Sequence, residues 1–254
     1  MGNIKIGDIF QLGDHRLACG DINDKDLLKR LIAQDKIKSI ITDVPYGVAY
    51  VESKAGFKQK LACEKIIAND QAQTDEEYKE FTSNWLNNIK EYLERKNSLY
   101  IFNSDKMIFP LREAILQAGF KFSQLLIWLK SQAVVGRLDY LPQHELIAYG
   151  WYKAHEFRRS KDKSVIFYPK PSKSKLHSTM KPVGLLRKII LNSTKINDIV
   201  FDGFGGSGSL LIAAEHLKRK SLMVELDIEH CQTIISRWEK LTGKKSVLID
   251  EKKI

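Results

Sequence analysis

The chain has 254 residues, 43% of them hydrophobic, which predicts one domain with a single sizeable core rather than two full domains. Its 41 Lys and Arg against 31 Asp and Glu give a formal net charge of +10, which favours a polyanionic partner such as nucleic acid without proving one. Three cysteines lack metal-binding spacing, and no segment resembles a signal peptide or a membrane span, so we expect a cytoplasmic protein without a metal site.

Short apolar runs alternate with amphipathic stretches along the chain, the pattern of strand and helix units around a parallel sheet. The expected strands are residues 16–19, 37–42, 98–102, 122–129, 199–201 and 221–224. The expected helices are residues 24–33, 74–94, 104–118, 182–193, 207–218 and 227–241, and Thr74 with Glu77 predicts a capping box at the start of the second one. The sequence thus predicts an α/β fold with a mainly parallel sheet and helices on both faces.

A loop with the sequence Asp43-Val44-Pro45-Tyr46 follows the second expected strand, at the end where open α/β sheets bind their ligands. A carboxylate and the backbone carbonyl of Val44 can accept both protons of an exocyclic base amine, which frees the nitrogen lone pair for attack. The tyrosine ring can stack on a base taken out of a duplex. An ordinary Pro-containing turn capped by Asp is the alternative interpretation. Residues 47–69 after it are polar and predict a long loop.

A second stretch, residues 131–176, mixes aromatic and basic side chains and predicts an inserted recognition region. Its alternative is a surface excursion with a small core of its own. We expect phosphate contacts from its second half, at Arg158, Arg159, Lys161 and Lys163. The side chains suited by type to read base edges are Arg137, Asp139, Tyr140, Gln143 and His144.

A glycine-rich loop, Asp202-Gly203-Phe204-Gly205-Gly206-Ser207-Gly208, follows an apolar strand and opens an amphipathic helix. Glycines allow this tight turn and let a ligand approach backbone N–H groups. The next strand ends at Glu225, a carboxylate that can accept hydrogen bonds from both hydroxyls of a ribose. The pair predicts a nucleoside-cofactor site. A dinucleotide dehydrogenase shares the glycine spacing, but Asp202 at the strand tip would repel a pyrophosphate and suit a cationic amino-acid group.

These motifs together resemble the β-class DNA amino-methyltransferases of restriction-modification systems and phages. In that family a DPPY motif precedes the target-recognition region, and the half that binds S-adenosylmethionine (AdoMet) comes last. Asp43-Val44-Pro45-Tyr46 matches DPPY, and residues 201–208 match the DPFxGSG segment. Cys19-Gly20-Asp21 is similar to the strand-end acid that contacts the cofactor adenine. His177-Ser178-Thr179-Met180-Lys181-Pro182 is similar to the H-P-T-x-K-P segment beside the methionine carboxylate.

The resemblance spans residues 17–241 and implies a Rossmann-like AdoMet-dependent methyltransferase fold with a circularly permuted motif order. It divides a single domain, residues 1–254, into a catalytic half (1–130), the inserted target-recognition region (131–176) and an AdoMet-binding half (177–254). The implied catalytic residues are Asp43, Val44, Pro45 and Tyr46. The implied AdoMet-binding residues are Asp21, Thr179, Lys181, Asp202, Gly203, Phe204, Gly205, Gly206, Ser207, Gly208 and Glu225. Duplex DNA is the implied partner, and the chain would act as a monomer or homodimer, with or without a cognate restriction nuclease.

The chain departs from the family pattern where Val44, Gly203 and Ser178 each replace a proline. We expect activity to survive at Val44, because the acceptor there is a backbone carbonyl and Pro45 still favours extended geometry at the preceding residue. In the family, Asp at the first loop position goes mostly with N6 of adenine, so we expect that target rather than N4 of cytosine. An RNA amine is the nearest rival substrate, and a nicotinamide-dependent oxidoreductase or a non-catalytic DNA-binding module is more distant.

Overall fold

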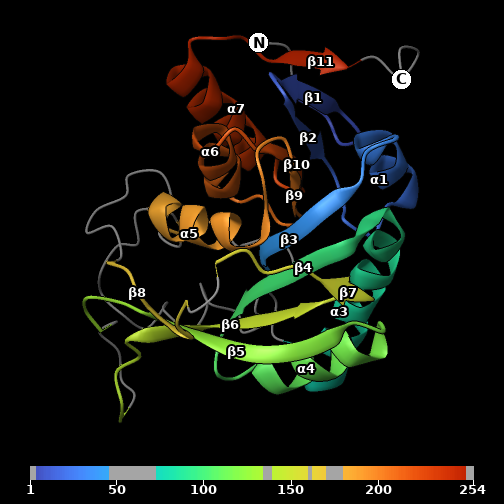
Figure 1. Ribbon diagram of the computed structural model, residues 1–254. Helices are drawn as coiled ribbons and strands as arrows, with labels where there is room; N and C mark the ends of the chain where they lie inside the picture. Colours follow the sequence, from blue (N-terminus) through green and yellow to red (C-terminus); the bar gives the residue numbers. More distant parts are fainter. Residues whose placement is uncertain (1–3, 46–72, 134–138, 160–161, 170–179, 250–254) are drawn as a thin grey trace.

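The computed structural model describes residues 4–45, 73–133, 139–159, 162–169 and 180–249, and a single sheet runs through these parts of the chain (Figure 1). The strands are β1 (Ile9–Leu12), β2 (His15–Cys19), β3 (Ile37–Asp43), β4 (Leu93–Asn103), β5 (Lys121–Leu129), β6 (His144–Trp151), β7 (Ala154–His155), β8 (Val165–Phe167), β9 (Ile199–Asp202), β10 (Lys220–Glu225) and β11 (Val247–Ile249). Their order is β11-β1-β2-β10-β9-β3-β4-β6-β5-β8, with β7 paired to β4 off this path.

The centre of the sheet consists of the neighbouring strands β2, β10, β9, β3 and β4, all mutually parallel. Strand β9 is apolar up to Asp202, and β3 is buried along its length up to Asp43, because both faces of these strands are covered. Parallel strands end on the same edge, so the last residues of β10, β9 and β3, which are Glu225, Asp202 and Asp43, come to one side of the molecule. This arrangement confirms the expected α/β fold with a mainly parallel sheet.

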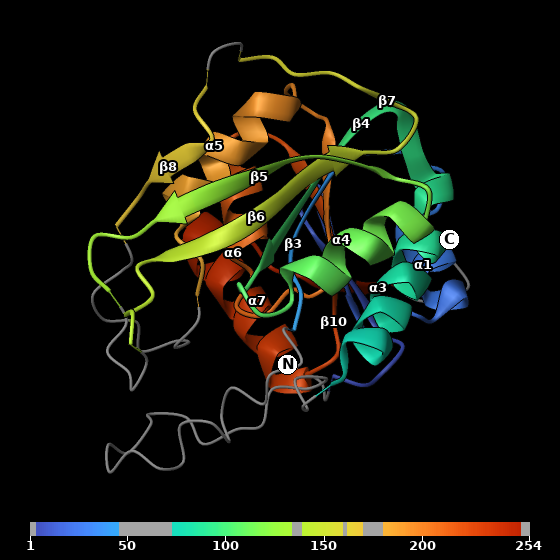
Figure 2. The same cartoon turned by 90° about the horizontal axis from the view of Figure 1, so that it is seen from below.

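Helices cover both faces of the sheet. They are α1 (Lys25–Ile32), α3 (Asp75–Ile89), α4 (Ile108–Gln117), α5 (Val183–Ser193), α6 (Ser209–His216) and α7 (Ile228–Thr242). One core packs α1, α3 and α4 against the sheet around Trp85, and the other packs α5, α6 and α7 around Trp238. Figure 2 shows the two helical groups on opposite sides of the strands. No helix in the described ranges is both long and apolar enough to cross a membrane.

Two helix predictions were too long. The capping box at Thr74 is present, with the Thr74 side chain accepting from the Glu77 N–H and the Glu77 side chain accepting from the Thr74 N–H. The helix ends at Ile89, however, and a single 3₁₀ turn, η1 (Lys90–Tyr92), leads into β4 at Leu93. The helix expected from residue 104 likewise begins only at Ile108. Charged residues at 90–96 favour a helix when they are taken by themselves. In the structure, pairing with β3 and β7 makes the segment from Leu93 onward part of β4.

The sheet also runs through the segment expected as an insertion, residues 131–176. Strand β6 from the middle of that segment lies antiparallel between β4 and β5, well inside the sheet. Tyr149 and Trp151 are core residues of this strand, and the Tyr149 ring lies 4.8 Å from that of Tyr100. Aromatic residues that looked like a nucleic-acid platform therefore belong partly to the sheet.

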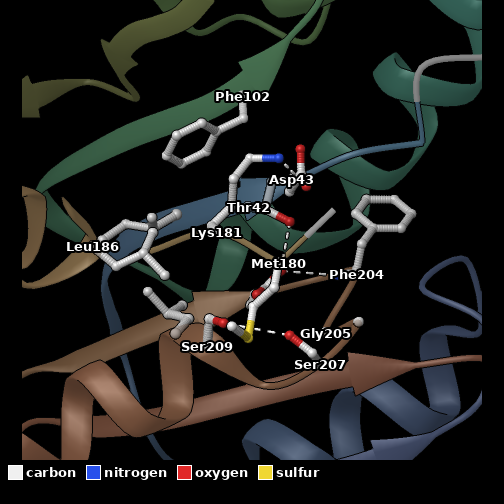
Figure 3. A pocket seen from close by; sticks show the side chains of 14 residues that line it. Thr42, Asp43, Phe102, Met180, Lys181, Leu186, Phe204, Gly205, Ser207 and Ser209 are labelled. Atoms are coloured by element: carbon white, nitrogen blue, oxygen red, sulfur yellow. Dashed lines mark hydrogen bonds and ion pairs between the residues drawn. The ribbon is translucent and has the colours of Figure 1, made fainter. Parts of the chain in front are cut away.

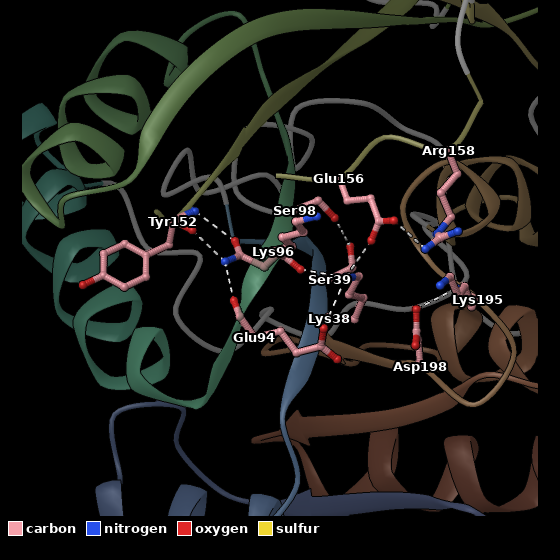
Figure 4. Close-up of polar contacts among 11 residues, drawn as sticks. Lys38, Ser39, Glu94, Lys96, Ser98, Tyr152, Glu156, Arg158, Lys195 and Asp198 are labelled. Carbon is pink, nitrogen blue, oxygen red and sulfur yellow. Dashed lines mark hydrogen bonds and ion pairs between the residues drawn. The ribbon is translucent and has the colours of Figure 1, made fainter. Parts of the chain in front are cut away.

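A polar cluster closes the amino end of the sheet (Figure 4). Buried Lys38 on β3 donates from Nζ to the carbonyl of Lys96 at 2.8 Å and lies 3.2 Å from a carboxylate oxygen of both Glu94 and Glu156. Arg158 donates to the other Glu156 oxygen at 2.7 Å. We call Lys38, Glu94, Glu156 and Arg158 the amino-edge cluster. Its contacts hold residues 152–158 against the edge of the sheet opposite Asp43 and Asp202.

Candidate active site

Asp202 ends β9 with its carboxylate turned into the protein. Thr42 Oγ1 donates to Asp202 Oδ1 at 2.7 Å, and the backbone N–H of Phe204 donates to the same oxygen at 3.1 Å. Burial raises the pKa of Asp202 to about 7, and the two hydrogen bonds only partly offset this effect. No cationic side chain in the described part of the chain forms an ion pair with it. This carboxylate is therefore suited to a positively charged ligand group.

The loop after Asp202 is held close to β10 and α7. A Cβ at Gly205 would lie only 2.7 Å from Met223 Sδ, so the backbone here approaches its neighbours more closely than any side chain allows. Gly208 begins α6 in the left-handed region at φ 77°, which favours glycine. Arg237 on α7 donates from its guanidinium to the carbonyl of Ser207 and fixes the end of the loop. The glycines thus allow a tight turn that leads directly into the amino end of α6.

Glu225 ends β10, the strand next to β9, and Asp21 follows β2, the strand on the other side of β10. The backbone N–H groups of Gly206 and Asp227 donate to Glu225 at 2.6 and 2.8 Å. Each hydrogen bond uses a different carboxylate oxygen, and a carboxylate has about four lone-pair sites, so acceptor capacity remains for ribose hydroxyls. Asp21 is exposed directly after β2, and its carboxylate accepts from the Asn23 N–H at 2.8 Å. The acids expected beside the ribose and the adenine thus lie on adjacent strand ends.

Asp43 ends β3 and forms an ion pair with Lys181, which donates from Nζ to Asp43 Oδ2. Lys181 Nζ also lies 3.2 Å from Glu145 Oε2, and Glu145 Oε1 lies 2.9 Å from Lys130 Nζ. Burial disfavours the Lys181 charge, but Asp43 and Glu145 outweigh it and raise the pKa of Lys181 to about 12. Burial also opposes the charge of Glu145, yet the two lysines hold its pKa below the ordinary value.

A pocket of about 450 Å³, partly open to solvent, joins these groups (Figure 3). Asp43 and Lys181 lie on one side, and Asp202 with the loop from Phe204 to Ser207 lies on the other. Phe102, Leu186 and Leu210 provide apolar walls. Its polar groups are few and convergent, as in small-molecule sites.

The structure brings together most of the site residues expected from the sequence. Asp43, Lys181, Asp202, Phe204, Gly205, Gly206 and Ser207 line one pocket, and Gly203 and Gly208 belong to the same loop. The Val44 side chain is buried in the core beside Asp43, and Pro45 follows it half-buried. Tyr46 and Thr179 lie outside the described residues, so their roles stay predictions. Lys181, expected beside a cofactor carboxylate, pairs with Asp43.

Several residues of the site were missed at the sequence level. Thr42, Phe102 and Glu145 contribute to it from three different strands. Only Thr42 carried a local signal, because it directly precedes Asp43 at the strand end. Glu145 lies 36 residues before Lys181 in a segment that seemed to serve recognition alone. Tyr78 on α3 also lies near Asp43, and its hydroxyl accepts a hydrogen bond from Asn103 Nδ2 at 2.7 Å. Burial is the main cause that raises the pKa of Tyr78, and the Asp43 charge adds a smaller effect.

The expected DNA-contacting residues divide between two ends of the sheet. Tyr140, which is 91% exposed, Gln143 and His144 lie in or next to the turn that leads into β6, on the same edge as Asp43. Arg158 instead belongs to the amino-edge cluster, and its backbone N–H donates to Asn192 at the far end of α5. Arg158 and its exposed neighbour Arg159 thus lie toward the edge opposite Asp43, and the DNA contacts expected of both sets stay predictions.

Two basic residues of the same set, Arg137 and Lys161, lie outside the described residues. Lys163 is exposed and precedes the edge strand β8, and Asp139 is exposed in the turn before β6. These four assignments stay predictions.

Comparison with known proteins identifies the family. A family model described as "DNA methylase", for N6 and N4 methylation, matches residues 37–236. The chain belongs to this family of DNA methylases. Its methyl donor is therefore AdoMet, and its substrate is DNA. Within the described residues, no group of three or more His, Cys, Asp or Glu could hold a metal ion.

Individual relatives support the same assignment. The type II methyltransferase M.HpaI of Haemophilus parainfluenzae is 26% identical over 250 residues, which covers 86% of this chain and 72% of that protein. The crystal structure of the M1.HpyAVI complex with AdoMet aligns with a TM-score of 0.63 at 23% identity over 87% of this chain and 98% of that one. The cytosine-N4-specific PvuII DNA methyltransferase aligns with a TM-score of 0.66 at 16% identity over 89% of each chain. At these identities the two structures establish a shared fold.

Proposed function

We propose that this DNA methylase transfers the AdoMet methyl group to N6 of an adenine extruded from a specific site in duplex DNA. The observation that carries the proposal is the single pocket in which Asp43, an acceptor for an amine, faces Asp202 and its glycine loop. Relatives named as type II methyltransferases support a site-specific reaction.

The described residues fit AdoMet. Asp202 offers a buried carboxylate to the cofactor's ammonium group, and Glu225 keeps acceptor capacity for its ribose. The amino end of α6 suits the methionine carboxylate. When bound, AdoMet supplies an electrophilic methyl group on a sulfonium sulfur. Because the pocket spans the space between Asp202 and Asp43, a base amine held at Asp43 would lie next to that methyl group.

The role of Asp43 is to accept a hydrogen bond from the target amine. An exocyclic amine is a poor nucleophile while its lone pair is delocalised into the ring, and acceptors aimed at its protons favour the pyramidal, reactive form. The Lys181 ammonium stabilises the negative charge of the Asp43 carboxylate, which keeps it an acceptor. The backbone carbonyl of Val44 is the proposed second acceptor, so its replacement of proline leaves the chemistry intact.

The test is methyl transfer from labelled AdoMet to duplex DNA, followed by identification of the methylated nucleoside. We expect N6-methyladenine, and Asp43→Asn should lower the transfer rate about 100-fold or more, because an amide offers a weaker acceptor. Asp35→Asn is the matched control: Asp35 precedes the amino end of the same strand and pairs with Arg16. Exclusive N4-methylcytosine, a preference for structured RNA, or full activity of Asp43→Asn would each overturn the proposal.

A further inference from the structure

Alternating charges run inward from the catalytic loop. Asp43 pairs with Lys181, Lys181 with Glu145 at 3.2 Å, and Glu145 with Lys130 at 2.9 Å. The side chains of Lys181, Glu145 and Lys130 are only 9%, 20% and 5% exposed, whereas Asp43 at the pocket end is 31% exposed. We call these residues the charge chain. Asp43, the most exposed member of the charge chain, is therefore the member that the substrate can reach.

The charge chain crosses neighbouring strands at the carboxyl edge of the sheet. Asp43 ends β3, Phe102 lies beside it on β4, Glu145 lies at the start of β6, and Lys130 directly follows β5. The order β3-β4-β6-β5 in the sheet matches the order of the contacts. Because β6 is antiparallel to β4, its first residues lie at this carboxyl edge, and Glu145 is one of them.

Two aromatic rings contact the two lysines of the charge chain. Lys181 Nζ lies 5.3 Å from the centre of the Phe102 ring, and Lys130 Nζ lies 5.3 Å from that of Trp128. The two rings contact each other edge to face, with centres 6.5 Å apart and an interplanar angle of 89°. Both rings are almost fully buried. Each ammonium is thus fixed by a carboxylate and by the face of a ring.

The far end of the charge chain is the base of the turn between β5 and β6. The Lys130 N–H donates to the Gln143 carbonyl at 2.8 Å, and the Gln143 side chain donates to the Lys130 carbonyl at 3.1 Å. This turn also carries Tyr140, so the polar contacts link it to Asp43. A buried ion pair adds little net stability compared with apolar packing, which makes a purely stabilising role a poor explanation of the arrangement.

We propose that Glu145 is a positioning residue for methyl transfer: through Lys181 it fixes the Asp43 carboxylate against the target amine, and through Lys130 it links Asp43 to the turn that approaches DNA. Glu145 lines no part of the pocket, so it acts only through its neighbours. The inference rests on the proposed function, because it assigns a role within that reaction.

Glu145→Gln tests this role, since it keeps the size of the side chain and removes its charge. The methyl-transfer rate in a single turnover, at saturating AdoMet and DNA, should fall at least tenfold, while the dissociation constants of AdoMet and DNA change less than twofold. Glu145→Asp should recover part of the rate. Because Glu145 acts through Lys181, the double variant Glu145→Gln with Lys181→Gln should be no slower than Lys181→Gln alone.

Glu156→Gln is the matched control. Glu156 lies at the same 3.2 Å from another buried lysine, Lys38, but at the opposite edge of the sheet (Figure 4). Its variant should keep the wild-type rate. An unchanged rate for Glu145→Gln, a rate loss in the double variant equal to the product of the single losses, or an equal loss for Glu156→Gln would each overturn the positioning role. A wild-type chain that methylates no DNA would instead overturn the proposed function and this role with it.

Discussion

Asp202 combines two demands that conflict in the absence of a ligand. Its carboxylate lies at the strand tip where the proposed cofactor ammonium would bind. Burial, with no cationic partner among the described residues, makes the ionised form unfavourable and raises its pKa to about 7. A buried carboxylate of this kind lowers the stability of the folded protein. The loss of stability should grow as the pH rises and the group ionises.

Asp202→Asn should stabilise the ligand-free protein at pH 8 by on the order of 2 kcal/mol. The pKa of Asp202 is raised on folding, so its ionisation costs stability progressively as the pH rises from about 4 to about 7. Asparagine can keep the hydrogen bonds from Thr42 and Phe204 and carries no charge. Denaturant unfolding at pH 5 and pH 8 should give a clearly larger gain at pH 8; the same gain at both values would contradict the assigned cause.

The same carboxylate should make AdoMet binding depend on pH. The cofactor's ammonium needs the ionised form of Asp202, so the affinity should fall up to tenfold for each pH unit below about 7. Calorimetric titration between pH 5.5 and pH 8.5 measures this slope. The Asp202→Asn variant should bind weakly with almost no such slope, and an equally steep slope in the variant would assign the effect to another group.

At the scale of elements, the glycine loop depends on how closely β9 and α6 pack against β10 and α7. Gly205→Ala would place a Cβ 2.7 Å from Met223 Sδ and 3.2 Å from Ile234 Cδ1, so either the loop or these two side chains have to move. We expect a loss of about 1–3 kcal/mol of stability and at least tenfold weaker AdoMet binding. Thermal unfolding with and without AdoMet gives both quantities.

Gly243→Ala provides the comparison for this prediction. Gly243 ends α7 at φ 71° with no atom within 4 Å of an added Cβ, so the change costs about 1 kcal/mol through the backbone alone. AdoMet affinity should stay at the wild-type value. Equal losses of affinity in both variants would mean that general destabilisation, rather than the loop, governs binding.

Local patterns predicted the elements that form the cofactor side of the site. The run before Asp43, the capping box at Thr74 and the glycines after Asp202 each lie within a few residues of the structure they determine. Strand β6 could not be recognised in this way, because its place between β4 and β5 depends on residues 15 to 51 positions away. The Glu145–Lys181 contact was hidden for the same reason: only the fold makes neighbours of two residues 36 positions apart.

For the whole molecule, the net charge of +10 favours DNA but says nothing about which surface binds it. The sheet divides the basic residues between two edges. Lys96 of β4 lies beside β7 and the amino-edge cluster, and Phe102 of the same strand lies beside Asp43. The six strand residues from one to the other span about 20 Å. We therefore expect DNA that delivers a base to the Asp43 pocket to approach the edge that carries Tyr140, Gln143 and His144.

This division predicts opposite outcomes for two substitutions. Arg158→Ala combined with Arg159→Ala should change DNA affinity less than twofold, because Arg158 belongs to the amino-edge cluster and pairs with Glu156. Tyr140→Ala should weaken binding about tenfold, because this highly exposed ring lies in the turn beside the pocket, and stacking on a base contributes about 1–3 kcal/mol. Fluorescence anisotropy on one duplex at several salt concentrations compares both variants. A large loss for the arginine pair, with a shallower salt dependence, would show that DNA also wraps around the amino edge and would extend the binding surface along α5.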